Sequence, residues 1–117
     1  MHLIIAPKNL NHIKWKVACD VDSPLLGINV ATAVYGPQKG ASPKDIVLLE
    51  QRLNNFCRCI SQQLGRSIWD LKGGGAAGGS AAGMYGFFNA NLVSGFPLLA
   101  KLVDLENEIE KADLIFT

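Results

Sequence analysis

The chain has 117 residues, of which 49% are hydrophobic, and this length suits one modest core but not two ordinary domains. The formal net charge of +1 argues against nucleic acid or an anionic membrane surface as the main partner. We therefore expect residues 1–117 to form a single unit, with residues 1–13 as a lead-in of unassigned role.

The first predicted strand runs from Lys14 to Cys19, where charged and apolar residues alternate before an apolar end. Asp20 and Asp22 follow it directly, ahead of Pro24, and the residue before a proline favours a loop. Ligands of open α/β sheets bind at the carboxyl ends of the strands, so both acids are candidate site residues. An Asx turn that only ends the strand accounts for them equally well.

Two helices are predicted in the next part of the chain. Residues 25–35 are small and apolar and favour a short helix that closes at the Gly-Pro pair that follows. Ser42 as N-cap, a proline at the first helical position and Asp45 in the first turn predict a longer helix over residues 43–64. Apolar residues that recur at steps of three and four give this helix one buried face: Ile46, Leu49, Leu53, Phe56, Ile60 and Leu64.

A stretch from Gly73 to Gly86 holds about half of the chain's 12 glycines, which lets other groups approach the backbone closely. We expect residues 73–78 to form an anion-facing turn and residues 79–86 to form a closely packed helix face. The first glycines also match the spacing of the dinucleotide-binding pattern. That pattern needs an acid about 20 positions later to hold the ribose. None is present, so a small dinucleotide-binding module is the lesser alternative.

The rest of the chain predicts a short strand at residues 91–93, a helix from Pro97 to Lys111 and a buried parallel strand from Ala112 to Thr117. The pattern indicates an α/β fold in which short parallel strands alternate with helices in a layered arrangement. Because a protein seldom stops on its own buried strand, we expect the chain to be a fragment, incomplete relative to a full fold.

Composition also indicates a cellular setting. No residue between Lys72 and Lys101 is ionisable at neutral pH, but glycines, asparagines and a proline interrupt this run, so we expect it to be buried and not to span a membrane. The odd number of three cysteines favours a reduced, cytoplasmic setting. Cys57 and Cys59 lack the further ligands that a zinc site needs.

Four segments carry a resemblance to a known family. They are residues 17–27, 35–43, 73–79 and 112–117, which read VACDVDSPLLG, YGPQKGASP, GGGAAGG and ADLIFT. In content and order they resemble the bacterial glycerate kinase family, which phosphorylates D-glycerate with ATP. Members of the family are considerably longer, so the resemblance implies an internal fragment that is inactive by itself. Ser23 stands where the family usually has Asn, and Lys72 where it usually has Pro.

The resemblance implies site residues. Asp20, Asp22 and Lys39 become catalytic candidates, with Lys39 pairing with a phosphate or with the glycerate carboxylate. Either aspartate could hold Mg²⁺ or accept the hydroxyl proton, and the residues leave these roles open. The expected residues that bind substrate or phosphate are Gln38, Gly73, Gly74, Gly75 and Gly78. The residues also leave open whether 2- or 3-phosphoglycerate is the product.

A different kind of function stays open beside the kinase. The chain could be a non-catalytic module that self-associates through apolar surface left exposed by missing segments. A monomer that binds nucleotide would argue against this alternative.

Overall fold

The fold alternates short strands with helices. The computed structural model describes residues 5, 10, 12–26 and 36–116. The elements in chain order are β1 (Lys16–Ala18), the 3-10 helix η1 (Pro37–Lys39), α2 (Pro43–Leu64), the 3-10 helix η2 (Ala76–Gly79), α3 (Ser80–Phe88), β2 (Asn91–Val93), α4 (Gly95–Leu102) and α5 (Leu105–Glu110). This order confirms the α/β class. The helix expected over residues 25–35 lies almost wholly outside the described residues.

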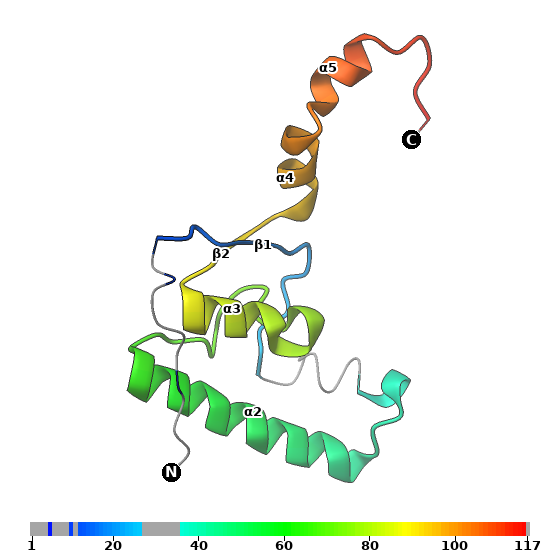
Figure 1. The fold of residues 1–117 in the computed structure, drawn as a ribbon. Helices are drawn as coiled ribbons and strands as arrows, with labels where there is room; N and C mark the ends of the chain where they lie inside the picture. Colours follow the sequence, from blue (N-terminus) through cyan, green and yellow to red (C-terminus); the bar gives the residue numbers. More distant parts are fainter. Residues whose placement is uncertain (1–4, 6–9, 11, 27–35, 117) are drawn as a thin grey trace.

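The two strands form a parallel sheet. Lys16, Val17 and Ala18 of β1 pair with Asn91, Leu92 and Val93 of β2. The sheet, α3 and α2 lie in successive layers in Figure 1. Trp15, just before β1, packs against Phe88 at the end of α3, with ring centroids 5.0 Å apart. Because the pairing is parallel, the carboxyl ends of both strands meet at one edge, as the prediction for the two acids requires.

Helix α2 has the predicted bounds because the residues that start and end it act on backbone groups of their own neighbours. The Ser42 hydroxyl accepts a hydrogen bond from the Asp45 amide, and the Asp45 carboxylate accepts one from the Ser42 amide at 2.9 Å. These two bonds form a capping box that satisfies backbone donors at the helix start. Gly65 ends the helix in a left-handed conformation, with φ of 67°.

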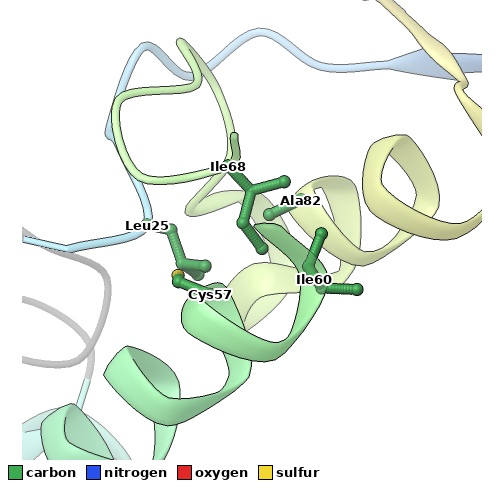
Figure 2. Close-up of a cluster of buried hydrophobic side chains, with 5 residues drawn as sticks. All are labelled: Leu25, Cys57, Ile60, Ile68 and Ala82. Carbon is green, nitrogen blue, oxygen red and sulfur yellow. The ribbon is translucent and has the colours of Figure 1, made fainter. Parts of the chain in front are cut away.

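The core lies between α2, α3 and the segments that flank them. Figure 2 shows its five fully buried side chains, Leu25, Cys57, Ile60, Ile68 and Ala82. Part of the predicted stripe of α2 therefore faces the core, and the remaining apolar residues of that stripe are partly exposed or exposed. The core is small because the described helices cover only one face of a two-stranded sheet.

The predicted close packing of residues 79–86 holds at two of its three glycines. A Cβ on Gly86 would lie 3.0 Å from Cγ2 of Ile60, and one on Gly79 would lie 2.7 Å from Cδ1 of Leu25. A Cβ on Gly83 would meet nothing within 4 Å, so this position of α3 is not tightly packed.

The prediction for the last third of the chain was wrong in two respects. The helix expected from Pro97 to Lys111 begins earlier, at Gly95, and is divided into α4 and α5 because Asp104 has a left-handed backbone with φ of 52°. The segment from 112 to 116, expected as a buried strand, is irregular and exposed, with Phe116 90% exposed. No strand among the described residues pairs with this segment, so its backbone has no ladder to join.

Helices α4 and α5 extend away from the layered body in Figure 1. A groove of about 620 Å³ runs along them and is lined by residues of both helices. In the part of the chain that the structure describes, no helix combines the length and the apolar content needed to cross a membrane.

Candidate functional site

A hollow of about 450 Å³ opens where β1 and β2 end. Three segments that lie far apart in the sequence form its wall: residues 19–22, residues 72–73 and residues 92–94. Its volume falls in the range of sites for small molecules. Both acids predicted at the end of the first strand line it, so the expected position of Asp20 and Asp22 is observed.

Asp20 is held by the start of α4. Its Oδ1 atom accepts hydrogen bonds from the Ser94 hydroxyl at 2.8 Å and from the Gly95 amide at 2.7 Å. These two donors, with the Phe96 amide, hold the pKa of the Asp20 carboxyl below its usual value, so the group is ionised at neutral pH. The N-terminus of a helix favours an anion in this position.

The contribution of Ser94 and Gly95 was not expected from the sequence. A serine followed by a helix is a common N-cap signal, but here the Ser94 side chain makes no cap for its own helix. It donates instead to Asp20, 74 positions away. Only the fold could reveal this contact.

Asp22 is held much more loosely than Asp20. Its Oδ1 atom lies 3.2 Å from Nζ of Lys72, and the two side chains are 80% and 78% exposed. An ion pair this exposed contributes little to stability, so both groups can change partners at little cost. Lys72 thus adds a cation to the wall of the hollow, opposite in charge to the two acids.

The glycine turn is shaped by close contact with the loop that follows β1. Gly73 has φ of 77°, and a Cβ there would lie 2.9 Å from Sγ of Cys19 and 3.0 Å from the carbonyl oxygen of Val21. A Cβ on Gly75 would lie 2.6 Å from the carbonyl oxygen of Pro24. The first glycines therefore bring the turn and the loop together to form one side of the hollow.

Several amides of this turn already have partners. The N–H groups of Gly74, Gly75 and Gly78 donate to the carbonyl oxygens of Leu71, Ser23 and Gly75. Among the four glycines predicted to bind phosphate, Gly73 lines the hollow and the other three do not. The structure therefore favours a shaping role for Gly74 and Gly75, both buried, while Gly78 is exposed.

Gln38 and Lys39 lie elsewhere. Both are exposed on η1, and neither lines the hollow. In Figure 1 this turn lies near the start of α2, on the other side of α3 from the sheet. The structure thus brings together Asp20, Asp22 and Gly73 but does not bring Lys39 to them.

The cysteines have separate surroundings. Cys57 is buried in the core, and this burial raises the pKa of its thiol to about 11. The Cys19 thiol donates to the carbonyl oxygen of Val21 at 3.3 Å, beside the hollow. Within the described ranges, no group of three or more His, Cys, Asp or Glu side chains is placed to hold a metal ion.

The fold and the hollow define an α/β chain whose candidate small-molecule site lies at the carboxyl edge of parallel strands. The sequence model of the glycerate kinase family matches residues 3–117, and the chain belongs to this family.

Named relatives agree with this assignment. A glycerate kinase of Halalkalibacterium halodurans is 39% identical over 108 residues, which cover 92% of this chain and 28% of the relative. The glycerate 2-kinase of Escherichia coli K12 is 40% identical over 102 residues, which cover 87% and 27%. The crystal structure of a candidate glycerate kinase 2 from Salmonella typhimurium LT2 superposes with a TM-score of 0.79 and 41% identity, over 89% of this chain and 28% of that one.

The resemblance to the glycerate kinase family is therefore confirmed, as is the expectation that only part of the family fold is present. The chain spans a little over a quarter of the length of the relatives it matches.

Proposed function

We propose that this chain supplies part of the active site of an ATP-dependent glycerate kinase, which transfers a phosphoryl group to D-glycerate. The observation that carries the proposal is the meeting of Asp20, Asp22 and Lys72 around one hollow at the strand ends. Phosphoryl transfer needs the phosphates and the acceptor hydroxyl to be positioned and the developing charge to be neutralised. A wall with two acids and one cation is suited to both tasks.

The donor set fits a magnesium ion shared with the nucleotide. Mg²⁺ prefers oxygen ligands and is commonly bound by one or two carboxylates, with phosphate oxygens and water completing its shell. Asp20 and Asp22 provide two carboxylates on the same wall. They would hold the ion, which when bound neutralises phosphate charge.

Other chain residues receive proposed roles from their positions. Lys72 and the backbone at Gly73 would contact phosphate oxygens at the rim of the hollow. Gln38 and Lys39 would contact phosphate or the glycerate carboxylate from the exposed turn η1, with Lys39 as a point charge. The remaining glycines, Gly74, Gly75 and Gly78, would contribute by fixing the shape of the phosphate turn.

The name of the E. coli relative, a glycerate 2-kinase, favours the 2-hydroxyl of glycerate as the acceptor. We place the enzyme in the cytoplasm, since Cys19 and Cys57 are present as thiols, as is usual in a reducing compartment.

A chimeric enzyme tests the proposal. The 108 matched residues of this chain replace their counterparts in the H. halodurans glycerate kinase, and transfer from ATP to D-glycerate is followed by coupled assay and by ³¹P NMR of the product. We expect an active chimera. Asp20→Asn and Lys39→Ala should each lower kcat/KM at least about tenfold.

Asp70→Asn and Lys44→Ala, which change exposed residues of the same types outside the hollow, serve as controls. An inactive chimera would contradict the proposal. So would turnover within about twofold of the unmodified chimera for Asp20→Asn and Lys39→Ala, a barrier change of about 0.4 kcal/mol or less.

A second candidate function, self-association of the isolated chain, is favoured by the exposed apolar surface of α4 and of the last residues. Leu102 is 71% exposed and Phe116 90% exposed, and apolar side chains line most of the groove along α4 and α5. Surfaces of this kind mark association sites. Leu102→Ser should lower the molar mass measured by light scattering, while Val47→Ser, an exposed apolar position on α2, should not. A wild-type monomer that binds ATP would exclude this candidate.

A further inference from the structure

We propose that Ser94 and Gly95 are positioning residues for the carboxylate of Asp20. The Ser94 hydroxyl and the Gly95 amide converge on a single atom, Oδ1, at 2.8 Å and 2.7 Å. Two donors on one oxygen fix the orientation of a carboxylate whose backbone belongs to a loop. This inference rests on the proposed function, because the two residues orient Asp20, whose own role is proposed there.

The contact also explains why residue 95 is glycine. A Cβ at this position would lie 2.5 Å from Oδ2 of Asp20, closer than a carboxylate oxygen approaches a methyl group. Glycine at this position of α4 therefore serves the close approach of Asp20.

The two acids of the hollow consequently differ in mobility. Asp20 is fixed by Ser94 and Gly95, whereas the partner of Asp22 among the described residues, Lys72, is itself exposed. A group that is already oriented loses less freedom when a ligand binds. Loss of either donor should therefore weaken ligand binding even though neither Ser94 nor Gly95 carries a charge.

The test uses the 117-residue chain and measures its dissociation constant for ATP with Mg²⁺ by NMR, from the shifts of backbone amides. Asp20→Asn retains an oxygen for both donors but removes the charge, and should weaken binding about tenfold. Ser94→Ala and Gly95→Ala should each weaken it about fivefold. Ser94→Thr, which keeps the hydroxyl, should recover most of the affinity.

Gly83→Ala is the matched control for Gly95→Ala, since a Cβ on Gly83 meets nothing within 4 Å. A readout without ligand is the Gly95 amide proton. It should lie downfield in the wild-type chain and move upfield in Asp20→Ala, which removes the acceptor.

The outcomes separate the two levels of the proposal. If Asp20→Asn weakens binding while Ser94→Ala and Gly95→Ala match Gly83→Ala, the positioning role is overturned and the proposed function stands. If Ser94→Thr binds as weakly as Ser94→Ala, the hydroxyl does not orient the acid and the inference also fails. If the wild-type chain does not bind ATP, Asp20 as held in this chain is not pre-organised for the ligand and the inference fails, while the chimera still decides the proposed function. If Asp20→Asn binds as tightly as the wild-type chain, the proposed function itself is overturned. Should Gly95→Ala fail to fold, the alanine and threonine variants of Ser94 decide alone.

Discussion

Two glycines of α3 allow the packing between α2 and α3 to be measured. A Cβ on Gly86 would lie 3.0 Å from Cγ2 and 3.2 Å from Cδ1 of Ile60, which is fully buried, whereas a Cβ on Gly83 would meet no atom within 4 Å. Replacing either glycine by alanine adds the same methyl group to the same helix. The two variants therefore differ in packing and share the gain in helix propensity.

The magnitudes follow from these contacts. Alanine in place of a helical glycine stabilises by about 1 kcal/mol, and the open space around Gly83 leaves this gain intact. At Gly86 the added methyl must displace Ile60, and overpacking of a core costs about 1–3 kcal/mol. We expect Gly83→Ala to raise the free energy of unfolding by about 1 kcal/mol and Gly86→Ala to lower it by about 0–2 kcal/mol.

Urea denaturation followed by far-UV circular dichroism measures both values, with equal m-values as the condition for comparison. In the background Ile60→Val, which removes Cδ1, Gly86→Ala should be better tolerated. Equal stabilisation by both alanines would refute the packing described between Gly86 and Ile60.

Three further outcomes are expected. The hydroxyl and amide of Ser42 donate to Asp45 and lower the pKa of its carboxyl. The capping box therefore stabilises the fold fully above the unfolded aspartate pKa of 3.8, and this contribution is lost as the pH falls through the folded pKa. Ser42→Ala should accordingly make the urea midpoint fall less steeply as the pH is lowered. Burial raises the pKa of the Cys57 thiol to about 11, so mass spectrometry should show iodoacetamide labelling of Cys57 only when the chain unfolds, and labelling in the native state at the rate of Cys19 would contradict its burial. Lys72→Met should change the free energy of unfolding by less than about 0.5 kcal/mol, because its ion pair with Asp22 is exposed, yet calorimetry should show severalfold weaker ATP binding; unchanged binding would remove Lys72 from the site.

The elements that could be predicted from the sequence are those with local causes. Helix α2 was bounded correctly because Ser42, Asp45 and the glycine after Leu64 each act on their own neighbours. Strand β2 was also bounded correctly, at residues 91–93. The break between α4 and α5 could not be foreseen, because no glycine or proline stands at Asp104, whose left-handed backbone divides the two helices.

The candidate site shows the same division. The position of Asp20 and Asp22 followed from the general rule about strand ends, and in the fold both residues line the hollow at this edge. The donors on Asp20 could not be predicted, since Ser94 and Gly95 meet it only after the strands have paired. The sequence had likewise indicated that the amides of the glycine turn are open to an anion. In the fold the Gly75 amide donates to the Ser23 carbonyl oxygen instead, which joins the turn to the loop after β1.

The parallel pairing of β1 with β2 has a consequence for folding. Asp20 and Gly95 are 75 positions apart, and closing so long a loop costs about 2–3 kcal/mol more than closing a short hairpin. This entropic cost is smaller if the strands pair after α2 and α3 have brought their ends together. The hollow is built from three distant segments and exists only once the strands have paired. A ligand that binds there therefore binds the folded chain alone and should raise the melting temperature in proportion to the logarithm of its concentration.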